Sequence, residues 1–523
     1  MFGQYEEPRI KTDWKQSNGI AAKAKQLKWS ERVMNVTPLV PIITLFIGAL
    51  VSYLFARLLP KPKYTGVVSF IFLVISGIQI FTLRSGTELL TWSIGGAQTY
   101  LEANGLAIFL GLVAVGLGAL VSLFSISYME HFDGLGRYYS LLLIMIAGIV
   151  GIGFAGDLFN MFVFFEVMAI PSYVLVAFEK DRWEPIEAAI KYIFMSVAGS
   201  LMALMGISLI FMYTGSLDLA ILANLTAGMD SLTAIGAVVL IIIGFGVKAA
   251  IVPLHTWLPD AHSAAPSGIS AMLSGIIIGA GFIAMIKALA VLPGVNSGVV
   301  LIIFGIVSMF VGNFIAIVQR DLKRMLAYSS IAQMGYILLG VGLAFAYLST
   351  GGEYGFRGGF LHILNHAVIK GGAFLCAGAI IYSIGTRDLE EMRGIGRKLP
   401  LIGVAFAFFG FALAGVPPLN GFISKFFICR AGVDVGGWGI VAMILLIVNS
   451  VLSLVYYLPA INKILFSSDI SEKAKEAKGI PPSIYIPIII MVILTVALGV
   501  YPELGLKIVD PVVSFMITSL GGS

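Results

Sequence analysis

The stretch GFGVKAAIVPLHTWLPDAHSAAPSGIS, residues 244–270, decides the fold of this chain. It continues a long apolar run, yet it contains Lys248 and Pro253. A charged side chain near the bilayer centre is costly, so such residues normally face a protein interior or a wet cavity. A proline there removes a backbone hydrogen bond, which lipid tolerates only where neighbouring helices or water satisfy the freed carbonyl. The stretch therefore predicts a broken transmembrane helix beside an ion site.

The composition of the whole chain agrees with a membrane protein. The chain is 59% hydrophobic and 12% charged, whereas soluble domains carry about 25% charged residues. The formal net charge of +5 arises mainly in loops, where basic residues orient helices, so it gives no reason to expect nucleic acid as a partner.

Apolar runs along the chain predict an all-α polytopic membrane protein with about fourteen transmembrane helices, at about 20 residues per crossing. The predicted spans are 37–59, 65–83, 105–128, 138–155, 157–178, 189–214, 233–257, 268–291, 298–318, 325–347, 359–384, 401–429, 437–464 and 482–502. We expect one transmembrane domain over 37–502, preceded by a polar, basic leader over 1–36 and followed by a short C-terminal tail over 503–523. The leader is either an interfacial helix or a disordered tail.

Loop charge predicts the orientation of these helices. Lysine and arginine concentrate in the odd-numbered loops, which should therefore be cytoplasmic, with both termini outside. The basic leader disagrees with this orientation, but a bias that alternates along the whole chain outweighs one tail. We expect a multi-pass protein of the cell membrane.

A second proline-broken span lies five helices further along. Pro417 and Pro418 precede Lys425 in the twelfth predicted helix, as Lys248 accompanies Pro253 in the seventh. Broken helices at corresponding positions in two halves indicate inverted repeats around an ion path. We predict two inverted five-helix repeats, helices four to eight and nine to thirteen.

Six segments together resemble one family. They are LFNMFVFFEVMAIPSYVLVAF (158–178), IEAAIKYIFMSVAGS (186–200), residues 244–270 quoted above, DLKRMLAYSSIAQMGYILLG (321–340), HILNHAVIKGGAFL (362–375) and GVPPLNGFISKFF (415–427). The chain resembles the antiporter-like subunits of respiratory complex I, Mrp-type sodium/proton antiporters and archaeal membrane-bound hydrogenase or sulfur-reducing complexes. Since it lacks a long C-terminal extension, it looks most like the shorter members, such as the Mrp D-type subunit and its hydrogenase relatives.

The resemblance implies roles for ionisable residues in the first half. The essential glutamate of the family falls on Glu166, with Lys191 as the basic residue that modulates it, and the lysine of the broken seventh helix falls on Lys248. Moving a counter-ion away from a buried lysine drives proton release. His255 follows in the same broken helix and is either a proton relay or a packing residue.

The second half carries a matching set of residues. His362, His366 and Lys370 are spaced by four, so they share one face of a helix, and they match the family's pattern for its central polar axis. Lys425 matches the terminal residue, from which the proton is thought to leave. Its alternative interpretation is a lysine near a helix end that extends to water.

One departure from the family lies in the eighth predicted helix. Relatives carry a bridging lysine or histidine where this chain has Ile278 or Gly279, neither of which can titrate. Lys287 lies two turns later, where we expect it to extend to water. The link between Lys248 and Lys370 must then use water or His255, or be absent.

Three functions fit the sequence. The first is an ion-translocating subunit of a larger complex, moving protons along the Glu, Lys and His residues, coupled to a redox module or to sodium exchange. The second is a mainly structural subunit with an interrupted path, and the third is an independent transporter of a small solute.

Two cysteines cannot ligate an iron–sulfur cluster alone, and no nucleotide loop is present, so we expect no cofactor and no metal here. Expected partners are other membrane subunits, including small Mrp-like proteins or a hydrogenase-like redox module.

Overall fold

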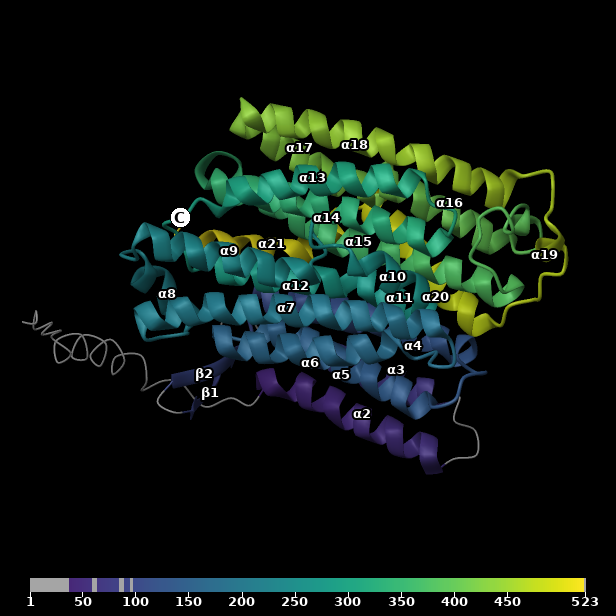
Figure 1. Ribbon diagram of the computed structural model, residues 1–523, viewed down its shortest axis with the longest axis horizontal. Helices are drawn as coiled ribbons and strands as arrows, with labels where there is room; N and C mark the ends of the chain where they lie inside the picture. Colours follow the sequence, from purple (N-terminus) through teal and green to yellow (C-terminus); the bar gives the residue numbers. More distant parts are fainter. Residues whose placement is uncertain (1–36, 59–63, 84–88, 95–96, 522–523) are drawn as a thin grey trace, which may run out of the picture.

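The computed structural model describes residues 37–58, 64–83, 89–94 and 97–521. The predicted leader over 1–36 lies outside the described residues. Within them the chain is almost entirely helical, and 13 helices are long and apolar enough to cross a membrane. They pack as one bundle of roughly parallel and antiparallel helices (Figure 1).

The predicted spans correspond to helices as follows. They are α2 (Val40–Leu58), α3 (Thr65–Thr82), α4 (Gly105–Tyr128), α5 (Leu135–Phe154), α6 (Leu158–Val176), α7 (Trp183–Thr214), α9 (Ser231–Lys248), α11, η3 and α12 (Ser267–Met272, Leu273–Ile277 and Ile278–Ala290), α13 (Ser297–Ile317), α14 (Leu322–Ala346), α15 (Leu348–Ile384), α16 and α17 (Pro400–Ala414 and Asn420–Val435), α18 (Trp438–Ile461) and α20 (Pro482–Val500). The η3 segment is a single π-helical turn. The all-helical membrane fold is confirmed, whereas the pairing of two inverted repeats stays a prediction.

Both spans in which the sequence predicted a break at a proline are broken. The predicted helix over 233–257 ends at Lys248, and a short helix, α10 (Trp257–Ala264), follows after the turn at residues 249–256. The second break lies between α16 and α17. Since proline cannot donate a backbone hydrogen bond, each helix stops before its proline and a new one begins beyond it.

The bundle has two polar ends. At one end lie a hairpin of β1 (Leu89–Ile94) and β2 (Ala97–Glu102), the short helix α8 (Leu219–Thr226) and the end of α21 (Glu503–Ser519), which we call the hairpin face. At the other end lie α19 (Glu472–Lys475) and the loops after α4, α6, α13 and α15, which we call the α19 face (Figure 1). Both ends of the described chain lie at the hairpin face.

The hairpin is tied to the bundle by two aspartates. The Tyr100 backbone N–H donates to Asp157 Oδ2 (3.2 Å), and the Tyr100 hydroxyl donates to Asp218 Oδ1 (2.7 Å). Burial, with Asp218 nearby, raises the pKa of Tyr100, so the phenol stays neutral and keeps donating.

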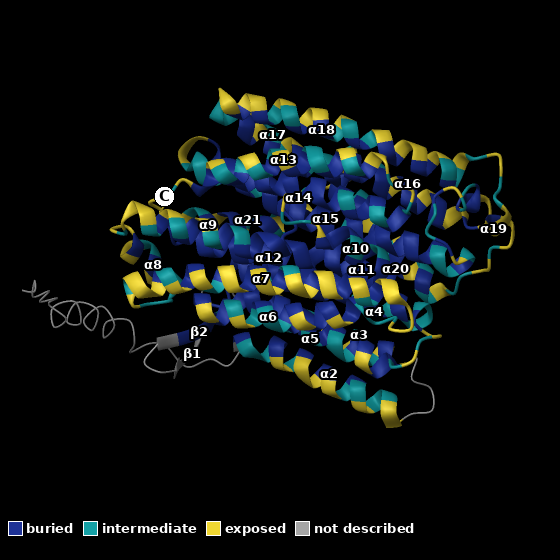
Figure 2. Cartoon of the chain, viewed as in Figure 1, coloured by how far each residue is buried: buried dark blue, intermediate teal, exposed yellow. Residues whose placement is uncertain are grey.

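The C-terminal segment, which we predicted as a tail, forms α21 and packs against α4 and α15. Buried residues concentrate in the middle of the bundle, along α11, α12, α14 and α15, while α2, α7 and α18 expose apolar side chains (Figure 2). Every residue of the span Ser267–Ala290 is buried. In a membrane protein, exposed apolar faces contact lipid or other subunits, so the polar groups of interest lie in the buried middle.

Candidate functional site

The first break is closed by hydrogen bonds that replace those of a continuous helix. The Trp257 indole N–H donates to the Val247 carbonyl (2.7 Å), and the Val252 N–H donates to Ser308 Oγ (3.1 Å). Backbone groups freed in a membrane must find such partners. The break therefore holds a defined shape, with Lys248 as the last residue of α9.

Lys248 lies in a cage of hydroxyls and aromatic rings. Its Nζ donates to the Tyr192 hydroxyl (2.9 Å) and to Ser196 Oγ (3.2 Å). It also lies 4.4 Å from the ring centroid of Tyr192 and 4.6 Å from that of Tyr173, within the range of cation–π attraction. The cage stabilises the ammonium without a carboxylate in contact with it.

Glu166 lies on α6 near this cage. Ser200 donates to Glu166 Oε1 (2.5 Å), and the charge of Glu166 acts on Lys248 without a direct ion pair. Tyr192, Ser196 and Ser200 are spaced by four, so they form one polar stripe along α7. This stripe joins the carboxylate to the lysine.

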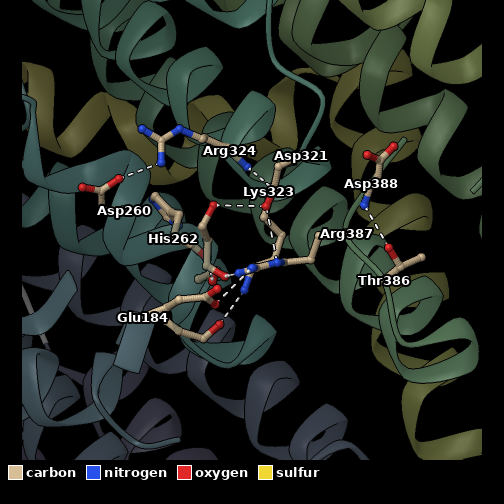
Figure 3. Close-up of polar contacts among 12 residues, drawn as sticks. Glu184, Asp260, His262, Asp321, Lys323, Arg324, Thr386, Arg387 and Asp388 are labelled. Atoms are coloured by element: carbon tan, nitrogen blue, oxygen red, sulfur yellow. Dashed lines mark hydrogen bonds and ion pairs between the residues drawn. The ribbon is translucent and has the colours of Figure 1, made fainter. Parts of the chain in front are cut away.

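Lys191 lies elsewhere, at the α19 face. Its Nζ pairs with Glu187 (2.8 Å) and with Asp260 (3.0 Å), and Arg324 also binds Asp260 (2.6 Å; Figure 3). Burial raises the pKa of Asp260, but Lys191 and Arg324 outweigh it and leave this pKa below its ordinary value. Lys191 thus belongs to a surface ion-pair network instead of touching Glu166.

His255 lies in the turn after Lys248. Its Nδ1 is buried and has no hydrogen-bond partner, and its ring lies 6.5 Å from that of Tyr328. The geometry leaves both of its predicted roles open.

The three predicted residues of α15 are all buried. His362 bonds to Ser424 Oγ through Nδ1 (2.8 Å) and to Gln333 Oε1 through Nε2 (2.9 Å). Lys370 donates to the Leu326 carbonyl (2.8 Å), and it also contacts Ser329. His366 lies between them with an unpartnered Nε2, its ring 6.4 Å from that of His362.

Lys425 lies at the second break. Its Nζ donates to the carbonyls of Leu413 (2.8 Å) and Ala414 (3.3 Å), the last residues of α16, and it lies 4.3 Å from the Tyr336 ring centroid. A cation at a helix C-terminus is favoured by the helix dipole. Lys425 is 4% exposed, so the extension to water that we left open does not occur.

Lys287 does not extend to water either, which corrects our expectation. It is 5% exposed, and its Nζ donates to the carbonyls of Ile152, Gly153 and Ala155 at the end of α5 (2.7–3.1 Å). Three unpaired carbonyls close to one another attract the ammonium more strongly than a distant surface does. Lys287 thus caps a helix.

The middle of the eighth span is apolar, with Ile278 buried. One turn earlier, the Ser274 hydroxyl bonds to that of Ser330 (2.7 Å). Ser330 neighbours Ser329, which contacts Lys370. Serine hydroxyls thus supply some of the polar groups that are missing at Ile278, between the two halves of the chain.

The sequence analysis missed most of the uncharged partners. These partners recur at intervals of four residues, and this spacing could have revealed them. They are Tyr192, Ser196 and Ser200 on α7, and Ser329 and Gln333 on α14. It also missed two buried basic groups, Lys323 and His262, because both lie next to loops rich in charge. Among the described residues, no three His, Cys, Asp or Glu side chains are placed to hold a metal ion.

Comparison with known proteins gives matches over most of the chain. The family described as NADH:quinone oxidoreductase/Mrp antiporter, transmembrane, matches residues 155–453. The NADH-quinone oxidoreductase subunit N of Desulforudis audaxviator is 33% identical over 79% of this chain and 85% of the relative. The F(420)H(2) dehydrogenase subunit N of Methanosarcina mazei is 32% identical over 90% of this chain and 95% of the relative.

Solved structures agree in fold. A chain of the membrane-bound sulfane sulfur reductase, an archaeal respiratory membrane complex, superposes with a TM-score of 0.80 at 28% identity, over 92% of this chain and 99% of that one. A chain of the Mrp complex from Dietzia sp. DQ12-45-1b superposes with a TM-score of 0.79 at 25% identity, over 93% and 99% of the two chains.

Proposed function

Because the chain belongs to the transmembrane family of NADH:quinone oxidoreductase and Mrp antiporter subunits, we propose that it moves protons across the cell membrane as one subunit of a larger complex. The protons pass along Glu166, Lys248, His362, His366, Lys370 and Lys425. The movement is coupled to a redox module or to sodium exchange in neighbouring subunits. The α19 face is cytoplasmic, since the loop lysines and arginines concentrate there.

One observation carries this proposal: a buried lysine and a nearby carboxylate are held apart by a hydroxyl cage. A direct ion pair would fix both charges. Here Lys248 donates to Tyr192 and Ser196, while Glu166 accepts from Ser200. Since Glu166 acts on Lys248 only through space, a change in the charge of Glu166 alters how readily Lys248 keeps its proton. This arrangement suits gating better than structural support.

The test uses the intact complex, isolated with this chain and reconstituted in vesicles with an internal pH-sensitive dye. We expect Glu166→Gln and Lys248→Met each to lower proton transport by about tenfold or more, while the complex still assembles. Lys475→Gln, at an exposed lysine of α19, is the control and should transport normally.

A mainly structural role is the second candidate, favoured by the apolar, buried Ile278 between the two halves. A structural subunit tolerates the loss of these charges once it is assembled. Normal transport in assembled Glu166→Gln and Lys248→Met complexes would therefore establish it and refute proton translocation by this chain.

A further inference from the structure

Two buried basic side chains near the α19 face have no part in the path proposed above. Lys323, in the first turn of α14, is 2% exposed, and its Nζ donates to the Ala265 carbonyl (2.5 Å). His262, on α10, is fully buried, and neither of its ring nitrogens has a hydrogen-bond partner. Because buried polar groups nearly always have partners, an imidazole with both nitrogens free requires an explanation.

A cavity at the α19 face leads to these residues. It has a volume of about 280 Å³ and is lined by Lys323, by Ala265, which accepts from Lys323, and by Ser263, the residue after His262. Glu179 and Arg387 also line it. A space of this size holds several waters, at ~30 Å³ each. Figure 3 shows His262, Lys323 and Arg387 at this place.

On its other side, His262 faces α15, where His362, His366 and Lys370 form a row of polar side chains. Its ring stacks on Phe374 with centroids 4.6 Å apart and planes 12° apart. Phe374 is one turn beyond Lys370, and Lys370 is one turn beyond His366, so the three lie on one face. The charges of Lys323 and Lys370 both act on His262. His262 therefore lies between the cavity and Lys370.

The row continues from this point toward the hairpin face. From Lys370 to His362 the helix advances by ~12 Å, at 1.5 Å per residue. His362 bonds to Ser424, the residue before Lys425. A series of polar groups thus leads from the α19 face to the second break. In order, it consists of the cavity, Lys323, His262, the three polar residues of α15 and Lys425.

We propose that the cavity, Lys323 and His262 form a proton inlet that supplies Lys370 directly from the α19 face. Water in the cavity delivers the proton by way of Lys323; His262 takes it on one ring nitrogen and releases it from the other toward Lys370. This supply adds to the path through Glu166 and Lys248 that is proposed above, and it reaches Lys370 without crossing the buried, apolar middle of the eighth span. The inlet explains how this half works although Ile278 and Gly279 cannot relay a proton. The inference rests on the proposed function.

A labelling experiment tests water access without measuring transport. In an assembled complex carrying Cys376→Ala and Cys429→Ala, we expect Lys323→Cys and, more slowly, His262→Cys to react with a membrane-impermeant methanethiosulfonate reagent. The reagent should act from the side that also labels Lys475→Cys. Ile278→Cys, buried in the apolar middle, is the control and should stay unlabelled. An unreactive Lys323→Cys, or one labelled only from the opposite side, overturns the inlet.

Transport separates this inference from the function on which it rests. Lys323→Met keeps most of the length of the side chain and His262→Phe keeps an aromatic ring that can stack on Phe374, so both variants should assemble. Each should lower proton transport about tenfold. If Glu166→Gln abolishes transport while these two variants retain it, the inlet is refuted and the function stands. If Glu166→Gln and Lys248→Met both transport normally, the function itself is refuted, whatever the labelling shows.

Discussion

The two broken helices each hold a buried lysine, but they stabilise it differently. Lys248 donates to side-chain hydroxyls and lies near a carboxylate, whereas Lys425 donates to the backbone carbonyls that end α16. Hydroxyls can also serve other partners, as Tyr192 and Ser196 do with Ser172 and Tyr173. The carbonyls at a helix end depend much more on their cap. A proline, a break and a lysine thus produce a lysine held by side-chain hydroxyls in one place and a lysine that also caps a helix in the other.

The largest expected effect is a difference in stability between Lys425→Met and Lys248→Met. Lys425→Met leaves the buried Ala414 carbonyl without its hydrogen-bond donor and should cost about 1–3 kcal/mol. Lys248→Met removes a buried charge whose partners keep other bonds, so it should be neutral or stabilising. The measurement is the temperature at which this chain is lost from the purified complex.

Lys287→Met is the control for that comparison. It removes a lysine that caps α5 in the same way, so it should lose comparable stability and keep proton transport. Equal melting of the Lys248 and Lys425 variants would show that the two breaks hold their lysines alike.

Tyr192→Phe sharpens the comparison at the first break. The change removes the hydroxyl that accepts from Lys248 but keeps the ring, which stacks on Trp257 at 3.9 Å. A hydrogen bond to a charged group contributes about 1.5–3 kcal/mol, so transport should fall at least about tenfold. Tyr173→Phe, whose hydroxyl donates to Ser196 and not to the lysine, should have a smaller effect. If Tyr173→Phe lowered transport more than Tyr192→Phe, the hydrogen bond from Lys248 to Tyr192 would not be the contact on which transport depends.

Gln333→Met makes the corresponding change at the second break. Gln333 Oε1 accepts a hydrogen bond from His362 Nε2 (2.9 Å), and Gln333 Nε2 donates to the Leu413 carbonyl (3.1 Å). Loss of a neutral hydrogen bond costs about 1 kcal/mol, so proton transport should fall about fivefold. Unchanged transport would remove Gln333 from the path.

The smallest expected effect lies at the surface, in the loop before α16. Hydrogen bonds from Lys463 (2.6 Å) and from Arg393 lower the pKa of Glu390 from 4.5 to about 2. Because this pKa is depressed in the folded state, the stabilisation is complete above pH 4.5 and is lost as the pH falls toward 2.

Glu390→Gln should therefore melt slightly earlier than the unmodified complex at neutral pH, and the difference should shrink as the pH falls below 4.5. A difference that grows on acidification would contradict the assignment. The ion pair is exposed, and such pairs contribute little, so only the trend with pH is diagnostic.

The sequence predicted the spans well because hydropathy and length are strong signals in a membrane. It missed the β1–β2 hairpin and α21, because short elements at the membrane surface carry no such signal. It placed α15 from 359, whereas the helix begins at Leu348, because the polar first turns resemble a loop.

The site was predicted unevenly for a related reason. Charged residues such as Glu166 and Lys370 stand out against apolar surroundings, whereas the serines and tyrosines that bind them do not. The corrections concern the partners that two lysines bind. Lys191 and Lys287 were assigned by position, and only the packing reveals that the nearest unpaired acceptors are Asp260 for one and the carbonyls of α5 for the other.

The π-helical turn at Leu273–Ile277 sets the rotation of everything that follows it in the eighth span. One extra residue in a turn shifts the angular phase of the remaining helix by about 100° relative to a regular α-helix. With this shift, Ser274 faces α14, Gly281 admits the Lys248 backbone and Lys287 reaches α5. Deleting a single residue there would rewind the segment and turn Lys287 away from the carbonyls that it now covers.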